Sequence, residues 1–199
     1  MDAGTETNAR ASTGTTSGKP HLFTVWDYHR MTEAGVLDED SRVELIRGQI
    51  TDMSPIGAPH FRTVNRLTRL LVPLVGAQGI VSVQNPVRLD GGSEPQPDVT
   101  ILHPRMDEDD AGTPGPADVL PLIEVADSSL GFDRATKLPL YAEAGIRDYW
   151  IVNLQDRAIE AHRDPEGGRC VRTRRIGFGE PLDILLLPGL TLPTVDLMR

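Results

Sequence analysis

The sequence has little cysteine, no long apolar run and a shortage of positive charge. Its single cysteine, Cys170, excludes an internal disulfide framework and any zinc site built from cysteines. No segment approaches the roughly 18 consecutive apolar residues of a membrane span. The N-terminus lacks the charged start and apolar segment of a secretory signal. These absences favour a cytoplasmic protein that acts away from membranes, where a lone thiol stays reduced.

The charge balance excludes one way of binding nucleic acid. The chain has 20 Lys and Arg residues against 29 Asp and Glu residues, a formal net charge of −9. This balance argues against binding through bulk positive charge. It allows an enzyme with acidic metal ligands and a local basic face, because bound divalent cations neutralise carboxylates.

Length and composition predict one folded domain behind a tail. A chain of 199 residues is long enough for a single domain with a sizeable core. Residues 1–20 are mostly small or polar and cannot offset the entropy of ordering, so we predict a disordered tail. The domain is then expected over residues 21–199. The segment 104–118, rich in Asp, Gly and Pro, is predicted to be a surface loop inside it.

The pattern of apolar residues predicts an α/β fold with a central mixed sheet flanked by helices. Thr24 and Asp27 form a capping box that predicts a helix ending near Gly35. Arg47-Gly48 predicts a hairpin turn within 43–53. Apolar residues spaced three to four apart predict an amphipathic helix over 61–74, which Pro73 should kink or end. The remaining predictions are a helix over 133–144 and strands over 80–89, 98–103, 119–126, 148–154, 157–162 and 170–176.

A carboxylate in an apolar strand is the strongest functional signal. Glu124 lies in the middle of Val119–Ala126, a segment expected to be buried on both faces. A buried ionised carboxylate is costly unless it is paired or binds a metal. The alternative is a glutamate that reaches solvent or a single arginine partner.

Two further carboxylates and one lysine have weaker settings. Asp98 opens an apolar strand, where it could instead cap the preceding turn. Glu44 lies in the predicted hairpin, where it could face solvent. Asp133, Lys137 and Tyr141 are spaced four apart and share one helix face. Asp133 and Lys137 could form a surface ion pair, or Lys137 could point towards Glu124.

Together these motifs resemble the Uma2 family of endonucleases. The resemblance covers residues 22–195 and is specific because many weak motifs occur in order. The motifs are Val43-Glu44-Leu45-Ile46-Arg47-Gly48-Gln49-Ile50, Met53-Ser54-Pro55, His60, Gln84-Asn85-Pro86, Pro97-Asp98-Val99, Glu124-Val125-Ala126-Asp127-Ser128-Ser129-Leu130, Asp133-Arg134-Ala135-Thr136-Lys137-Leu138-Pro139-Leu140-Tyr141-Ala142 and Gly145-Ile146-Arg147-Asp148-Tyr149-Trp150-Ile151-Val152.

The resemblance implies a PD-(D/E)XK nuclease core and a set of site residues. Asp98 and Glu124 are the implied metal ligands, and Glu44 is the acidic residue of the N-terminal part of the site. The superfamily usually has a lysine two residues after the second carboxylate, but here that position is Ala126. A lysine supplied by the following helix is a known variation, and Lys137 fits it.

The implied activity is Mg²⁺-dependent hydrolysis of phosphodiester bonds, most simply in DNA, with Mn²⁺ as a possible substitute. Such cleavage needs an activated water, neutralisation of the phosphate and stabilisation of the leaving oxygen, which metal ions held by carboxylates supply. Lys137 would orient or help deprotonate the water and stabilise the transition state. A homodimer would place two sites on two strands, although no sequence feature requires one.

Four more residues are candidate substrate contacts, each with a structural alternative. His60 precedes the amphipathic helix and could contact phosphate or metal, or could merely support the helix start. Gln84 could line the site or lie on an outer face. Arg62 and Arg66 could contact a phosphate backbone or simply be solvated.

Two other functions compete with the nuclease. The missing lysine at Ala126 suggests a non-catalytic nucleic-acid-binding or regulatory module on a nuclease fold. A structural protein whose carboxylates form ordinary ion pairs is the third possibility.

Overall fold

The computed structural model describes residues 19–38, 41–107 and 112–198. The predicted tail falls almost entirely on residues 1–18, which lie outside the described ranges. None of the helices within those ranges is long and apolar enough to cross a membrane.

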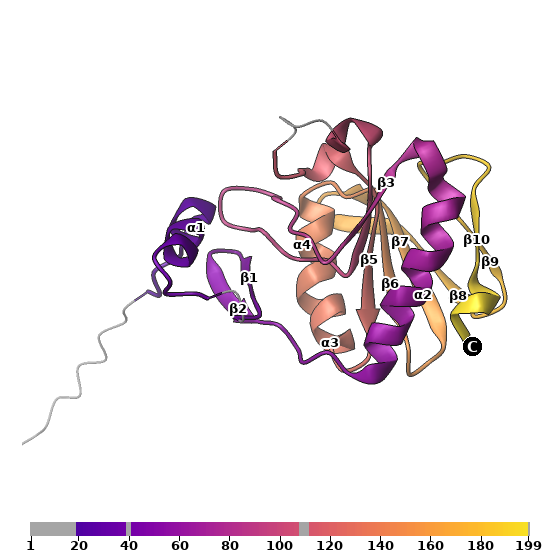
Figure 1. Cartoon of the computed structure of the whole chain (residues 1–199), viewed down its shortest axis with the longest axis horizontal. Helices are drawn as coiled ribbons and strands as arrows, with labels where there is room; N and C mark the ends of the chain where they lie inside the picture. The colour runs from indigo at the N-terminus through magenta and orange to yellow at the C-terminus, as the bar shows by residue number, and fades with distance from the viewer. Residues whose placement is uncertain (1–18, 39–40, 108–111, 199) are drawn as a thin grey trace, which may run out of the picture.

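A six-stranded mixed sheet forms the centre of the protein, as the apolar pattern predicts. Strands β5 and β6 are parallel, and every other neighbouring pair is antiparallel. The strand order is β3 (Ile80–Val83), β4 (Val99–Leu102), β5 (Val119–Ala126), β6 (Asp148–Asn153), β7 (Ala158–Glu166) and β8 (Arg169–Gly177). Figure 1 shows this sheet between α2 and α4.

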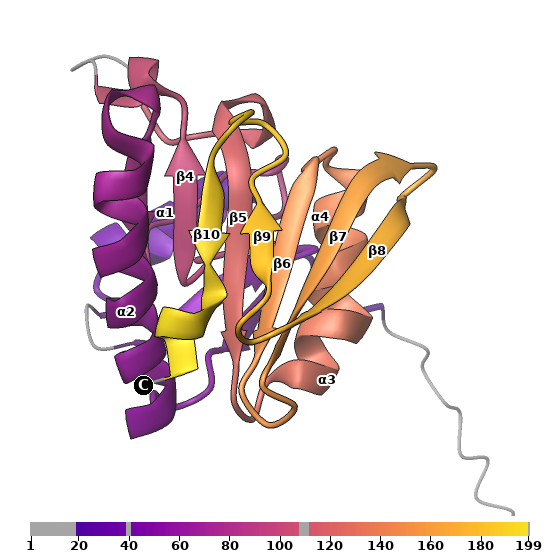
Figure 2. The ribbon, with the colours of Figure 1, turned by 90° about the vertical axis from the view of Figure 1, so that its right-hand side faces the viewer.

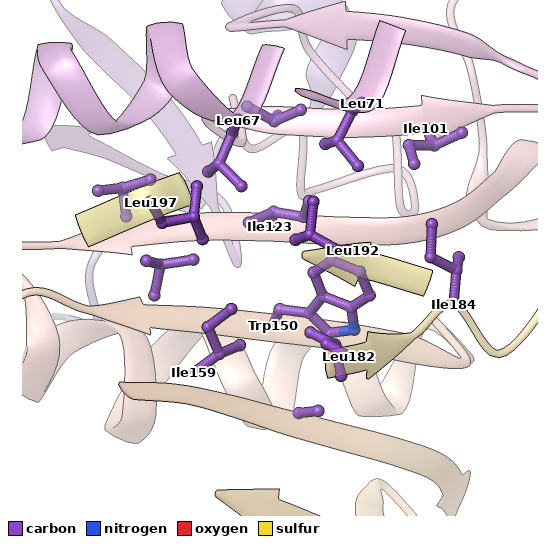
Figure 3. Close-up of a cluster of buried hydrophobic side chains, with 14 of the residues drawn as sticks. Leu67, Leu71, Ile101, Ile123, Trp150, Ile159, Leu182, Ile184, Leu192 and Leu197 are labelled. Atoms are coloured by element: carbon purple, nitrogen blue, oxygen red, sulfur yellow. The ribbon is translucent and has the colours of Figure 1, made fainter. Parts of the chain in front are cut away.

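One face of the sheet is covered by α2 (Ala58–Val75) and by the short pair β9 (Pro181–Asp183) and β10 (Thr191–Pro193), as Figure 2 shows. Leu67 and Leu71 on α2 are fully buried against Ile123 and Trp150 of the sheet (Figure 3). The predicted helix therefore forms. It continues through Pro73 and ends two residues later, at Val75.

The opposite face is covered by one helical segment with three parts. It consists of α3 (Leu130–Phe132), a π turn (Asp133–Lys137) and α4 (Leu138–Glu143). Within the π turn the N–H of Leu138 bonds the carbonyl of Asp133. Pro139 has no N–H to continue the α-helical pattern at this point. The segment begins three residues before the predicted start and links the parallel strands β5 and β6.

The N-terminal elements follow their local sequence signals. Helix α1 (Val25–Glu33) opens with the predicted capping box, in which the N–H of Asp27 donates to Thr24 Oγ1 at 3.1 Å. Strands β1 (Val43–Ile46) and β2 (Gln49–Asp52) form the predicted hairpin. Arg47 and Gly48 have φ values of 50° and 76°, the left-handed conformation that favours tight hairpin turns.

Some strand boundaries differ from the predictions. Strand β3 ends at Val83 rather than near residue 89, because Gln84 has a φ of 51° and turns the chain out of the sheet. Strands β7 and β8 extend further than predicted, and the three-residue strands β9 and β10 were not predicted. In the predicted loop 104–118, the described ends form 3₁₀ turns, Pro104–Asp107 and Pro116–Asp118.

The packing of α2 generates a stability prediction. Leu67 is fully buried, whereas Val72 on the same helix is 53% exposed. We expect Leu67→Ala to lower the free energy of unfolding by about 2–5 kcal/mol, because it removes buried methyl groups and leaves a cavity. Val72→Ala should stay within about 0.5 kcal/mol of the wild type. Denaturant unfolding of both variants checks this, and equal losses would contradict the observed packing.

Candidate active site

A cavity of about 250 Å³ brings together residues that are far apart in the sequence. Its walls come from the β1–β2 hairpin, the start of α2, the head of β4, the end of β5 and the π turn. All four residues predicted to be catalytic line it: Glu44, Asp98, Glu124 and Lys137. His60 lines it as well. The sequence prediction that these side chains meet is therefore consistent with the geometry.

Asp98 and Glu124 face each other across neighbouring strands. The antiparallel register pairs Val99 of β4 with Ile123 of β5, which places Asp98 opposite Glu124. Both side chains are buried, with 7% and 4% of their residue surfaces exposed. Like charges in directly opposite positions destabilise a sheet. A nearby cation would therefore reduce the repulsion between these two carboxylates.

The side chain of Glu124 points to the sheet face that carries the π turn and α4. Its neighbours on that face of β5, Leu122 and Ala126, pack in the same apolar cluster as Tyr141. Glu124 Oε1 accepts hydrogen bonds from Lys137 Nζ and from the Tyr141 hydroxyl, both at 2.9 Å. Neither alternative for Glu124, solvent exposure or a single arginine partner, is what the structure shows.

Burial raises the pKa of Glu124 to about 8, against an ordinary value of 4.5. Lys137 opposes the rise, while the nearby carboxylates of Asp98, Asp133 and Glu44 add to it. Desolvation thus outweighs the attraction of the single ammonium group. A cation bound beside Glu124 would favour the ionised form and remove this cost.

Lys137 lies buried between two carboxylates. Its Nζ is 2.9 Å from Glu124 Oε1 and 3.1 Å from Glu44 Oε2. Burial alone would lower the pKa of Lys137, but Glu124 and Glu44 outweigh it and hold the pKa above its ordinary value. The group therefore stays a cation, suited to electrostatic work rather than to accepting a proton. The alternative of a surface ion pair between Asp133 and Lys137 is wrong, because Lys137 is only 5% exposed and pairs with Glu44 and Glu124.

Glu44 is buried rather than solvent-facing, because the chain around Gln96 runs along the hairpin. The backbone N–H of Gln96 donates to Glu44 Oε2 at 3.2 Å, and only 2% of Glu44 is exposed. The side-chain amide of Gln96 donates to the Gln84 carbonyl. Gln84 in turn donates to Asp98 Oδ1 at 3.4 Å. Gln96 thus links the hairpin carboxylate to the carboxylate on the sheet.

Asp98 accepts hydrogen bonds from the sheet and from α2. Its Oδ2 atom accepts from the N–H of Val125 at 2.9 Å and lies 3.0 Å from His60 Nε2. The side chain of Asp98 therefore does more than cap the preceding turn, because it contacts β5 and α2. Within the described residues, His60 Nδ1 is buried without a hydrogen-bond partner.

The structure adds a fourth carboxylate that the sequence did not assign to the site. Asp133 lines the cavity and is 2% exposed, and Ser129 Oγ donates to its Oδ2 atom at 2.7 Å. Burial raises the pKa of Asp133, while Ser129 and Lys137 oppose the rise. Its position four residues before Lys137 was the available signal.

Arg62 and Arg66 lie away from the cavity lining. Arg62 is exposed on α2, and Arg66 donates to the Leu197 carbonyl at 3.3 Å. Their proposed contact with a phosphate backbone stays a prediction.

The donor set fits a small divalent cation. The buried ammonium of Lys137 lies among four buried carboxylates that line the cavity. These carboxylates are Glu44, Asp98, Glu124 and Asp133. No group of three or more His, Cys, Asp or Glu side chains in the described ranges forms a ready-made metal cage. Mg²⁺ is usually held by one or two carboxylates, with water and substrate phosphate completing its shell. Asp98 and Glu124 supply that number of hard oxygen ligands.

The comparisons with known proteins agree with this geometry. The model of the Uma2 family, described as "Putative restriction endonuclease", matches residues 25–195. This chain belongs to the Uma2 family. A search of curated proteins gave no match.

A solved structure shows that the Uma2 chain shares a known fold. It is the crystal structure of a "putative nuclease belonging to DUF820" from Anabaena variabilis. The match has a TM-score of 0.68 at 13% sequence identity, and it covers 88% of this chain and 97% of that one. The mixed α/β fold predicted from the sequence is thereby confirmed.

The raised pKa of Glu124 generates a pH prediction for the metal-free protein. Between pH 4.5 and about 8 the folded state holds a proton on Glu124 that the unfolded state releases. The contribution of Glu124 to stability therefore falls as pH rises through this window, by up to roughly 1.4 kcal/mol for each pH unit. Glu124→Gln should gain stability over the wild type as pH rises from 5 to 9.

Denaturant unfolding in EDTA at pH 5, 7 and 9 measures this difference. Glu33→Gln changes an exposed carboxylate on α1 and serves as the control, with a difference within about 0.5 kcal/mol at each pH. The prediction would be contradicted if the free energy of unfolding of the wild type rose relative to that of Glu124→Gln as pH increases.

Proposed function

We propose that this protein is a metal-dependent endonuclease that hydrolyses phosphodiester bonds in DNA. The observation that supports this most is the buried site in which Asp98 faces Glu124 while Lys137 joins Glu124 to Glu44. The lysine missing at Ala126 is replaced in space by one from the neighbouring helix. Family membership and the fold shared with the DUF820 structure support this chemistry.

Asp98 and Glu124 would hold the cation, for which we propose Mg²⁺, with Mn²⁺ as a substitute. When bound, such an ion activates water and neutralises charge on the phosphate. Their oxygens line one cavity, and His60 and Gln84 orient Asp98 through contacts of 3.0 and 3.4 Å. His60 and Gln84 would thus position the metal ligand Asp98, and only His60 also lines the cavity.

Lys137 would stabilise negative charge that develops on the phosphate. Its ammonium group is fixed by two carboxylates and needs no rearrangement during the reaction. Because its pKa is raised, it does not take the proton of the attacking water in this state. Glu44 holds the ammonium from the hairpin side. Arg62 and Arg66 would contact the DNA backbone outside the cavity, and a homodimer would cut both strands.

The metal site generates the first functional prediction. We expect Mg²⁺ or Mn²⁺ to raise the Tm of the wild type by several degrees at saturation, because a ligand of the folded state stabilises it. Asp98→Asn should lose most of this shift. Asp52→Asn changes an exposed carboxylate at the cavity rim and should keep it.

Thermal unfolding with and without added DNA checks the metal prediction. The DNA arm tests whether phosphate is needed to complete the metal shell. A wild type with no cation shift in either arm would contradict the metal site and favour the structural protein.

The role of Lys137 generates a second functional prediction. Lys137→Met should lower the cleavage rate of plasmid DNA in Mg²⁺ by about 100-fold or more, the usual loss on removing a preorganised charge from a reaction site. Arg30→Met removes an exposed cation on α1 and should leave the rate unchanged. Circular dichroism is the control that checks whether each variant is folded. A wild type that binds cation and DNA but cleaves nothing would favour the non-catalytic module.

A further inference from the structure

Tyr141 contacts the proposed metal ligand Glu124 from a fixed position. It lies on α4, one helical turn after Lys137, and it is fully buried. Its ring packs against Tyr149 with 4.9 Å between the ring centres. Its hydroxyl donates to Glu124 Oε1 at 2.9 Å. The contact is therefore made by a rigid side chain that has no room to turn away.

The two oxygens of Glu124 have different surroundings. Oε1 accepts bonds from both Tyr141 and Lys137 at 2.9 Å. Among the described residues, none donates a hydrogen bond to Oε2. Because Glu124 lines the cavity, Oε2 is the oxygen left for a bound ion. The arrangement therefore leaves Oε2 available to an ion, while Oε1 is occupied by two hydrogen bonds.

Building on the proposed nuclease function, we propose that Tyr141 is a positioning residue that makes Glu124 a one-oxygen ligand and so favours Mg²⁺ over Ca²⁺. Mg²⁺ requires a tight octahedral shell at 2.0–2.1 Å, whereas Ca²⁺ accepts six to eight oxygens and often both oxygens of one carboxylate. A carboxylate that offers a single oxygen therefore suits the smaller ion.

Lys137 alone is less able to fix the carboxylate. Its ammonium is shared between Glu124 and Glu44, so it does not hold the carboxylate of Glu124 alone. The phenol of Tyr141 has only two side-chain torsions, and both are held by packing. Without its hydroxyl, the carboxylate of Glu124 can turn about its last torsion and offer both oxygens to an ion. Groups that orient a metal ligand typically contribute about 10-fold or more to affinity.

The test is isothermal titration of metal-free protein with MgCl₂, MnCl₂ and CaCl₂, for the wild type and Tyr141→Phe. We expect the Kd for Mg²⁺ to rise about tenfold in Tyr141→Phe. The Kd for Ca²⁺ should rise less, so the preference for Mg²⁺ narrows. Direct titration of folded protein keeps the result independent of any change in Tm.

Tyr149→Phe is a matched control, because it deletes the same group from a neighbouring buried tyrosine. Within the described part of the chain, the Tyr149 hydroxyl is buried without a hydrogen-bond partner. Its removal should leave all three Kd values unchanged.

The outcomes separate the two proposals. A Tyr141→Phe protein that is less stable in EDTA but keeps the wild-type ratio of Mg²⁺ to Ca²⁺ affinity has lost only packing, and the positioning role is overturned. Equal effects of Tyr141→Phe and Tyr149→Phe overturn it as well. In both cases a wild type that binds Mg²⁺ leaves the nuclease proposal standing. A wild type that binds no cation, with or without DNA, overturns both.

Discussion

The buried ammonium of Lys137 is the interaction on which the rest of the site depends. It reaches Glu124 in the sheet and Glu44 in the hairpin, with separations of 2.9 and 3.1 Å. Three segments that are distant in the sequence therefore meet at one charge. Buried ion pairs are weak contributors to stability, and apolar replacements of similar volume often match or exceed them. Stability alone does not explain why the fold keeps this one.

The surrounding carboxylates make it electrostatically costly to ionise Glu124. Asp98 and Asp133 lie near Glu124 and raise its pKa further, beyond the effect of burial. The hydrogen bonds from Val125, His60 and Ser129 hold these carboxylates in place rather than cancelling their charge. A protein selected only for stability would replace such groups. Their joint burial in one cavity, with raised pKa values for Glu124 and Asp133, marks the cavity as the candidate functional site.

Sequence patterns predicted what depends on neighbouring residues. The apolar run around Glu124 predicted a strand buried on both faces, and all eight residues of β5 are buried. The spacing of Leu67 and Leu71 predicted the buried stripe of α2, and the Arg47-Gly48 turn predicted the hairpin. In each case the signal and the structure it predicts lie within a few residues of each other.

The parts that were missed depend on distant contacts. Glu44 was predicted in the site from the family resemblance, but the hairpin pattern alone left it free to face solvent, because alternation in a short hairpin does not show that residues near 96 cover it. Asp133 was given only as a possible surface ion-pair partner, and Tyr141 had no assigned role, since the π turn that directs this helix face is not visible in apolar spacing. Strands β9 and β10 are three residues long and carry little pattern. One available signal was composition: Lys137 is one of only two lysines in the chain.

Placing the lysine on a helix also changes how the site is assembled. A lysine at position 126 would lie on the same strand and face as Glu124, where Ala126 packs in the apolar cluster beneath the helical segment. From the π turn, one ammonium reaches both the sheet and the hairpin. The charge arrangement therefore exists only when the sheet, the helical segment and the hairpin are docked together. This couples the electrostatics of the site to complete folding, which a lysine within β5 itself would not do.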